Sequence, residues 1–165
     1  GFLFTVSLLL QSCIAYSFSG TSLSSEIKSF SLQCQSNIAL GPVDLAAQLA
    51  ERLSQELMQR TSLKQVEQGD IQLELTIKRF EYIPVALGGS IEDSRAQGDV
   101  SRLVIAVEVS YTNPTDQLAS FSQRTFSQSA DMLVDESIAL EESKLIEEIF
   151  TKLAEDIFNA SVANW

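Results

Sequence analysis

The sequence contains no histidine, and this absence removes a large part of enzyme chemistry from consideration. Histidine is the most frequent general acid or base in active sites and a usual ligand of zinc and non-haem iron. Nucleophiles that depend on a histidine base are therefore excluded.

Cysteine is scarce as well, since the chain has only Cys13 and Cys34. Two thiols this far apart, without histidine, make a poor metal site, and we expect no metal and no cofactor. If Cys13 carries lipid on its sulfur, Cys34 has no disulfide partner in the chain. If Cys13 is unmodified and the compartment is oxidising, a Cys13–Cys34 disulfide is the alternative.

Basic residues are half as numerous as acidic ones, with 11 Lys and Arg against 22 Asp and Glu and a net charge of −11. The summed field of such a chain repels polyanions. We therefore expect no nucleic acid partner and no broad attraction to an anionic membrane surface. The 45% hydrophobic content nevertheless indicates a folded domain.

Long apolar runs are also missing, because the run that opens the chain has about ten residues and a membrane span needs about 18–20. A run of this length is typical of a secretion signal. It ends in Leu10-Gln11-Ser12-Cys13, which fits a permissive lipoprotein cleavage motif. We predict a signal remnant at 1–12, lipid attachment at Cys13 and a lipidated tether at 13–25. The alternative is an N-terminal strand or core helix with an ordinary buried cysteine.

The first half of the chain predicts a strand, a helix and a second strand. Apolar alternation predicts a strand at 27–34, and leucines repeating every four residues predict a helix at 43–60, with Pro42 near its first turn. A regular strand begins at Ile71. Its apolar phase reverses after Ile77, which predicts a bulge near Lys78-Arg79 or a second buried face that begins there.

The second half predicts two further strands and a long helix. Residues 84–99 read as a long connection, 103–111 as a strand, and 137–159 as an amphipathic helix. The weak apolar pattern of 118–130 predicts an edge strand or a strand in an unusual environment. The predicted fold class is α+β, a two-layer sandwich with two helices packed on one face of a four-stranded mixed sheet, in the order β-α-β-β-β-α. It forms one domain over 26–165, and the uncovered sheet face is polar.

Paired carboxylates are the remaining candidates for acid–base catalysis, and their positions do not support an enzyme. Glu141-Glu142, Glu147-Glu148 and Glu155-Asp156 fall on the polar face of the last helix, where solvated side chains are the expected interpretation. Glu92-Asp93 lies in the long connection without the ligand spacing of a calcium loop. We predict no catalytic residues.

A collinear set of segments resembles the LptE family of lipopolysaccharide-assembly lipoproteins from Gram-negative bacteria. The segments include Cys13 with the Tyr16–Ser22 stretch, Gly69-Asp70-Ile71, Pro84-Val85-Ala86, Arg102–Ile105, Val109–Asn113, Leu145–Ile149, Asp156–Asn159 and Asn164-Trp165. The resemblance implies two helices on a four-stranded mixed sheet. It also implies an outer-membrane lipoprotein that plugs, and helps assemble, the large LptD-like barrel that exports lipopolysaccharide. The alternative is a periplasmic lipoprotein that scaffolds another envelope complex.

Contact with polyanionic lipopolysaccharide would need a local basic cluster in this acidic chain. The basic candidates are Lys78, Arg79, Arg95, Arg102 and Arg124. Of these, Lys78, Arg102 and Arg124 share residue parity on three predicted strands, so we predict that they converge on the uncovered sheet face. The alternative is that they balance neighbouring carboxylates such as Glu74 and Glu108.

Overall fold

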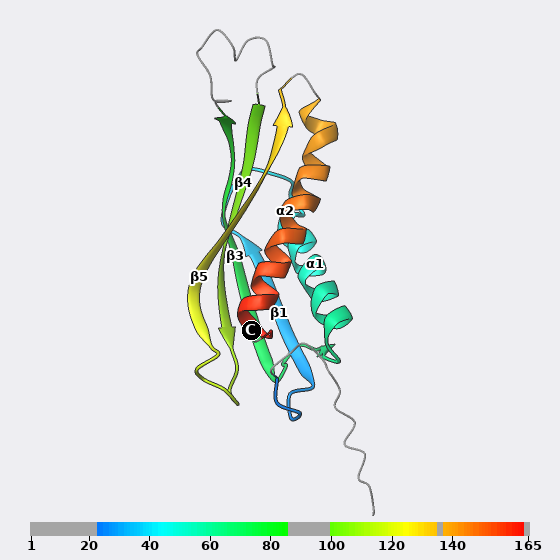
Figure 1. The fold of residues 1–165 in the computed structure, drawn as a ribbon, viewed down its shortest axis with the longest axis vertical. Helices are drawn as coiled ribbons and strands as arrows, with labels where there is room; N and C mark the ends of the chain where they lie inside the picture. The colour runs from blue at the N-terminus through cyan, green and yellow to red at the C-terminus, as the bar shows by residue number, and fades with distance from the viewer. Residues whose placement is uncertain (1–22, 86–99, 135–136, 164–165) are drawn as a thin grey trace, which may run out of the picture.

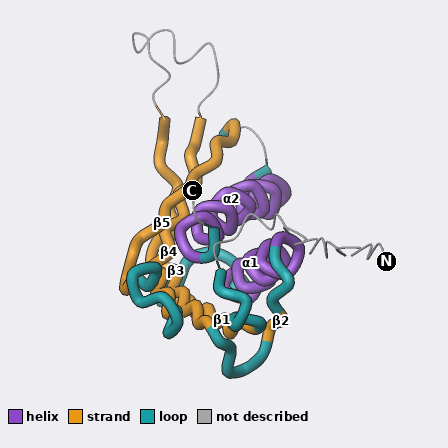
Figure 2. Tube along the Cα trace, turned by 60° about the horizontal axis from the view of Figure 1, so that its bottom comes forward, coloured by secondary structure: helices purple, strands orange, loops and turns teal. Residues whose placement is uncertain are grey.

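The computed structural model describes residues 23–85, 100–134 and 137–163, which form one mixed sheet with two helices. The elements are β1 Ser29–Ser36, α1 Leu45–Arg60, β2 Lys64–Gln65, β3 Ile71–Val85, β4 Val100–Thr112, β5 Phe121–Leu133 and α2 Ile138–Ser161. Both helices cover the same face of the sheet (Figure 1, Figure 2). Neither helix in this part of the chain combines the length and apolarity that crossing a membrane requires.

The sheet has five strands in the order β2-β1-β3-β4-β5, so the prediction of four strands was wrong in number. The additional strand, β2, contains only two residues and pairs parallel to β1. It forms because backbone N–H groups of Lys64 and Val66 donate to the carbonyls of Lys28 and Phe30. A two-residue strand has no periodicity of its own and leaves no apolar pattern in the sequence.

The remaining pairings confirm the predicted α+β class. Strand β1 pairs parallel to β3 after a crossover through α1, and β3, β4 and β5 form an antiparallel meander. The register of β3 shifts between Ile77 and Arg79, which confirms the predicted bulge. The bulge returns Phe80 to the face covered by the helices, where its side chain is buried.

The core lies between the helices and the sheet. Leucines of α1 and apolar residues of α2 interdigitate with the inward side chains of β1, β3 and β4. The side chains with less than 2% exposure include Phe30, Leu45, Leu49, Leu53, Leu57, Ile71, Leu73, Leu75, Ile77, Leu103, Tyr111 and Phe158. Ile138 is 53% exposed because it occupies the first position of α2.

Strand β5 is one edge of the sheet, which agrees with the first of the two interpretations of its weak apolar pattern. It begins at Phe121 because residues 113–120 form a turn. Asn113 organises this turn, since its side-chain Oδ1 accepts the backbone N–H groups of Thr115 and Asp116 at 3.0 and 3.2 Å.

The sheet is longer on one side than on the other. Strand β1 pairs with β3 only over Ile71–Ile77, whereas β3 and β4 remain paired to Val85. In Figure 1, β3, β4 and β5 therefore continue well above the end of β1. With about 3.3 Å per residue, the 15 residues of β3 extend about 50 Å and make the domain elongated.

Candidate functional site: the open face of the sheet

The face of the sheet opposite the helices, here called the open face, is polar over β1, the first half of β3 and the second half of β4. The side chains that alternate outward there are amides, hydroxyls and carboxylates. They are Gln33 and Gln35 of β1, Gln72, Glu74 and Thr76 of β3, and Glu108 and Ser110 of β4. Hydroxyl and amide groups dominate, so this face suits a polar partner surface.

Lys78 projects from the bulge of β3 and forms an ion pair with Glu108 of β4. The Nζ–Oε1 distance is 3.8 Å, and both side chains are partly exposed. This is the partner that the charge-balance alternative predicted. A long, solvated pair of this kind contributes little to stability and leaves the ammonium accessible.

Arg102 is held more firmly than Lys78. Its Nε and Nη2 atoms donate to the two carboxylate oxygens of Asp131 on β5, at 2.7 and 3.0 Å. The guanidinium lowers the pKa of the Asp131 carboxyl below its ordinary value, and the carboxylate raises the pKa of Arg102. A bidentate pair fixes the guanidinium plane and uses two of its five donors.

Arg124 does not lie on the open face, so the predicted convergence of the three cations was wrong. It pairs with Val109 on β4 and therefore lies on the side covered by the helices. Its guanidinium lies 5.0 Å from the ring centre of Phe126. The parity of Phe126, two residues on, indicated this orientation in the sequence.

Lys78 and Arg102 are also well separated along the sheet. Arg102 is opposite Ile83 of β3, five residues beyond Lys78 and thus about 16 Å away along the strand. Arg79 lies nearer to Lys78, and its Nη2 contacts Glu81 at 2.7 Å. Each of these three cations on the open face therefore has its own carboxylate. Arg95 lies outside the described residues.

Acidic side chains of the three predicted pairs on α2 form hydrogen bonds and an ion pair with neighbouring residues. Tyr82 donates to Glu142 at 2.7 Å, Gln128 donates to Asp156 at 2.6 Å, and Lys152 pairs with Glu148 at 2.8 Å. Burial and the hydrogen bond to Glu142 raise the pKa of Tyr82. Within 23–85, 100–134 and 137–163, no three acidic or cysteine side chains are grouped as metal ligands would be.

Of the two cysteines, only Cys34 lies within the described residues. Cys34 is a free thiol that packs against the core, and burial raises its pKa to about 12. Such a thiol is a poor nucleophile at neutral pH. Cys13 lies outside the described residues.

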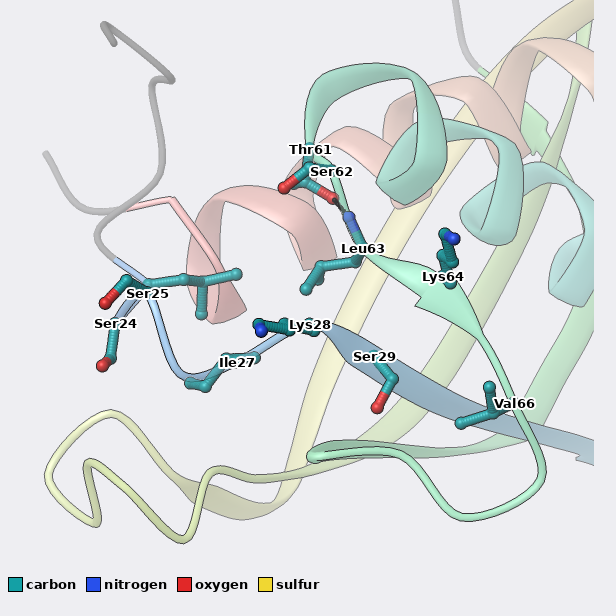
Figure 3. A pocket seen from close by; sticks show the side chains of 11 residues that line it. Ser24, Ser25, Ile27, Lys28, Ser29, Thr61, Ser62, Leu63, Lys64 and Val66 are labelled. Atoms are coloured by element: carbon teal, nitrogen blue, oxygen red, sulfur yellow. Dashed lines mark hydrogen bonds between the residues drawn. The ribbon is translucent and has the colours of Figure 1, made fainter. Parts of the chain in front are cut away.

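The sequence analysis missed a cleft of about 770 Å³ beside the start of β1 (Figure 3). Residues 23–25 and 27–29 line one side, and residues 61–64 with Val66 line the other. Gly69 and Asp70 lie at the same end of the sheet. The Asp70 carboxylate accepts the backbone N–H groups of Lys28 and Ser29 at 2.9 and 3.1 Å. No periodic pattern in the sequence indicates this cleft, because loop segments far apart in the chain form it.

Comparison with solved structures finds lipoproteins to which this chain is similar. Rare lipoprotein B from Shewanella oneidensis has a similar crystal structure, with a TM-score of 0.55 and 18% identity over 81% of this chain and 92% of that chain. A minor lipoprotein from Acinetobacter baumannii gives a TM-score of 0.47 and 15% identity over 84% of this chain and 98% of that chain. No curated protein matches the sequence.

The sequence model described as "LptE: Lipopolysaccharide-assembly" matches residues 27–161, which include all seven elements of the structure. This match covers most of the chain and includes those segments of the resemblance that lie between residues 27 and 161. The chain therefore belongs to the LptE family, which gives it a general role in lipopolysaccharide assembly at the cell envelope.

Proposed function

We propose that the chain is a non-enzymatic outer-membrane lipoprotein, attached through Cys13, that plugs an LptD-like barrel and helps this barrel assemble. The barrel is the large β-barrel that exports lipopolysaccharide. The family match over residues 27–161 is the observation that carries this proposal. The lipid anchor rests on the Leu10–Cys13 motif of the sequence.

The surface of the domain supports a position inside a barrel. Large membrane barrels have polar interiors, so a plug needs polar surfaces on several sides and not one apolar face. The first part of the open face carries Gln33, Gln72 and Glu74, and the outer sides of both helices are rich in glutamine and glutamate. An elongated domain with polar surfaces on opposite faces meets this requirement.

A pull-down tests the proposed partner. The chain with a C-terminal tag is purified from envelopes in mild detergent, and the co-purifying proteins are identified by mass spectrometry. We expect one large β-barrel protein in near-equal amount. Recovery of an unrelated envelope complex would instead support the alternative, a scaffold of another assembly.

The anchor is tested separately, by labelling cells with radioactive palmitate. The parent chain should carry label, and a Cys13→Ser variant should not. Label that persists in the variant would contradict attachment at Cys13, whatever the pull-down shows.

We also propose that Lys78 and Arg102 contact lipopolysaccharide during its transit, and Arg124 remains a weaker candidate on the other face. The ion pairs with Glu108 and Asp131 make a paired test possible. If the cations bind the ligand, the double variant Lys78→Gln/Arg102→Gln weakens binding, by up to roughly fivefold per charge. The matched variant Glu108→Gln/Asp131→Asn frees both cations and strengthens binding.

Binding of purified lipopolysaccharide is measured on both variants after their fold is verified by circular dichroism. Opposite changes support the contact. Equal affinities in the parent and both variants would show that these ion pairs only balance charge.

A further inference from the structure

The cleft beside β1 combines an apolar lining with polar edges. Ile27 and Leu63 contribute buried side chains, and Val66 is 43% exposed. Serine hydroxyls and two lysines complete the lining (Figure 3). Lys28 comes from the segment that enters β1, and Lys64 comes from β2, so each side of the cleft supplies one ammonium group.

These two lysines are unusual in this acidic chain because neither has an ion-pair partner among the described residues. Six of the ten lysines and arginines in the described ranges have a carboxylate oxygen within 4.0 Å. The other four are Lys28, Arg52, Lys64 and Arg124. Arg124 stacks over phenyl rings, and Arg52 lies in a groove between the helices. The two that remain line the same cleft.

The carboxylate that interacts with Lys28, Asp70, is already engaged by other donors. It accepts two backbone N–H groups and the hydroxyl of Ser29 at 3.0 Å. The sequence before the cleft supplies no other acid, because residues 1–22 contain no Asp or Glu. Glu26 and Glu67 flank the cleft in sequence, yet neither lies within 4.0 Å of an ammonium group. The cleft is therefore lined by two cations that lack ion-pair partners among the described residues.

We propose that this cleft binds the phosphate headgroup of an anionic phospholipid. The two lysines attract the phosphate electrostatically, serine hydroxyls donate to ester or glycerol oxygens, and the apolar side chains contact the first carbons of the acyl chains. The combination of two cations with an apolar lining fits an amphiphile better than a free phosphate, which has no apolar part to bury.

The position of the cleft in the chain agrees with a ligand in the bilayer. Leu23 follows Cys13 by ten residues, so the intervening chain spans at most about 35 Å when fully extended. If the lipid anchor is present, it therefore holds the cleft near the membrane surface. This placement rests on the proposed anchor, whereas the charge and lining of the cleft do not.

The test separates binding in the cleft from anchoring. Dihexanoyl phosphatidylglycerol, at concentrations where it is monomeric, is titrated calorimetrically into the full chain carrying Cys13→Ser. Parallel titrations use dihexanoyl phosphatidylcholine and glycerol 3-phosphate. A lysine near an anionic lipid contributes roughly a fivefold factor in affinity. We expect Lys28→Gln/Lys64→Gln to weaken phosphatidylglycerol binding at least tenfold.

The matched control is Lys144→Gln/Lys152→Gln, which removes the same charge from α2, away from the cleft, and should leave the affinity unchanged. Val66→Ser should weaken phosphatidylglycerol binding but not alter the response to glycerol 3-phosphate. Thermal unfolding verifies that each variant is folded.

Three results would overturn the proposal. Equal binding of phosphatidylcholine would remove the role of charge, and equal binding of glycerol 3-phosphate would indicate a simple phosphate site. An equal loss of phosphatidylglycerol affinity in Lys28→Gln/Lys64→Gln and in Lys144→Gln/Lys152→Gln would show that only the net charge of the chain matters. Failure of the palmitate experiment leaves this titration unaffected, because the titrated chain carries no anchor.

Discussion

At the scale of single residues, Gly69 lies against the backbone of β1 with no space for a side chain. A Cβ atom at this position would meet the carbonyl carbon of Phe30 at 2.3 Å and the nitrogen of Ser31 at 2.4 Å. Backbone atoms cannot move aside as a flexible side chain would. We predict that Gly69→Ala destabilises the fold by about 3 kcal/mol, near the upper end of overpacking costs. Urea unfolding measures this loss.

The control for this prediction is Ser62→Ala, at an exposed loop position near the same end of the sheet. It should change the stability by less than about 0.5 kcal/mol. A Gly69→Ala variant as stable as this control would show that the backbone at Gly69 does not lie this close to the backbone of β1.

Asp70, the residue after Gly69, makes the stability of the fold depend on pH. Hydrogen bonds from the backbone of Lys28 and the side chain of Ser29 hold the pKa of its carboxyl below the ordinary value. A lowered pKa in the folded state means that the ionised form stabilises the fold above about pH 4, and this stabilisation is lost as the pH falls further.

We therefore predict that Asp70→Asn makes stability less dependent on pH between about pH 5 and 2. Urea midpoints across this range provide the measurement. Asp131→Asn should reduce the dependence independently, because Arg102 lowers the pKa of that carboxyl at a distant site. Identical acid profiles for the parent and Asp70→Asn would contradict the prediction.

At the scale of elements, β5 contains a strained residue where its register with β4 shifts. Gln123 has φ 52°, in the left-handed region, and its N–H donates to Ser110 Oγ at 3.0 Å. Glycine adopts this conformation without steric strain because it has no Cβ atom. We predict that Gln123→Gly leaves stability unchanged or raises it by up to about 1 kcal/mol. Thr125→Gly, two residues on in extended backbone, should lower it by about 1 kcal/mol.

Thermal unfolding of the two variants compares the same replacement at two positions of one strand. Opposite or clearly different shifts in Tm support the bulge geometry. Equal destabilisation by both variants would show that Gln123 is ordinary strand in solution.

The sequence was sufficient to predict the elements that repeat a pattern. Leu45, Leu49, Leu53 and Leu57 predicted α1, and the reversal after Ile77 predicted the bulge of β3. Each of these signals comes from burial that recurs at the period of the element. The starts of α1 and β5 differed by two or three residues, because caps and turns lack such a period.

The features that were missed depend on contacts between distant segments. Strand β2 exists only because β1 offers free backbone groups beside it, and the cleft joins residues 23–29 to the loop after α1. The face of Arg124 was assigned by parity alone. The turn before β5 resets that parity, and the buried Phe126, which shares the parity of Arg124, was the local signal that indicated the side covered by the helices.

At the scale of the whole molecule, the proposed role as a plug requires that opposite faces of the domain contact the same partner. A plug is surrounded by its barrel, so both the open face and the outer side of the helices contact the same protein. A scaffold docked through one surface contacts its partner on one face only. Gln72 on the open face and Gln55 on the outer side of α1 are both exposed and provide matched positions for this distinction.

The measurement that tests the central claim most directly is therefore photo-crosslinking in living cells. Benzoylphenylalanine replaces Gln72 in one variant and Gln55 in another, and the crosslinked partners are identified by mass spectrometry. The account predicts that both positions crosslink to the same large β-barrel protein. Crosslinks from only one of the two positions, or to two unrelated proteins, would contradict it.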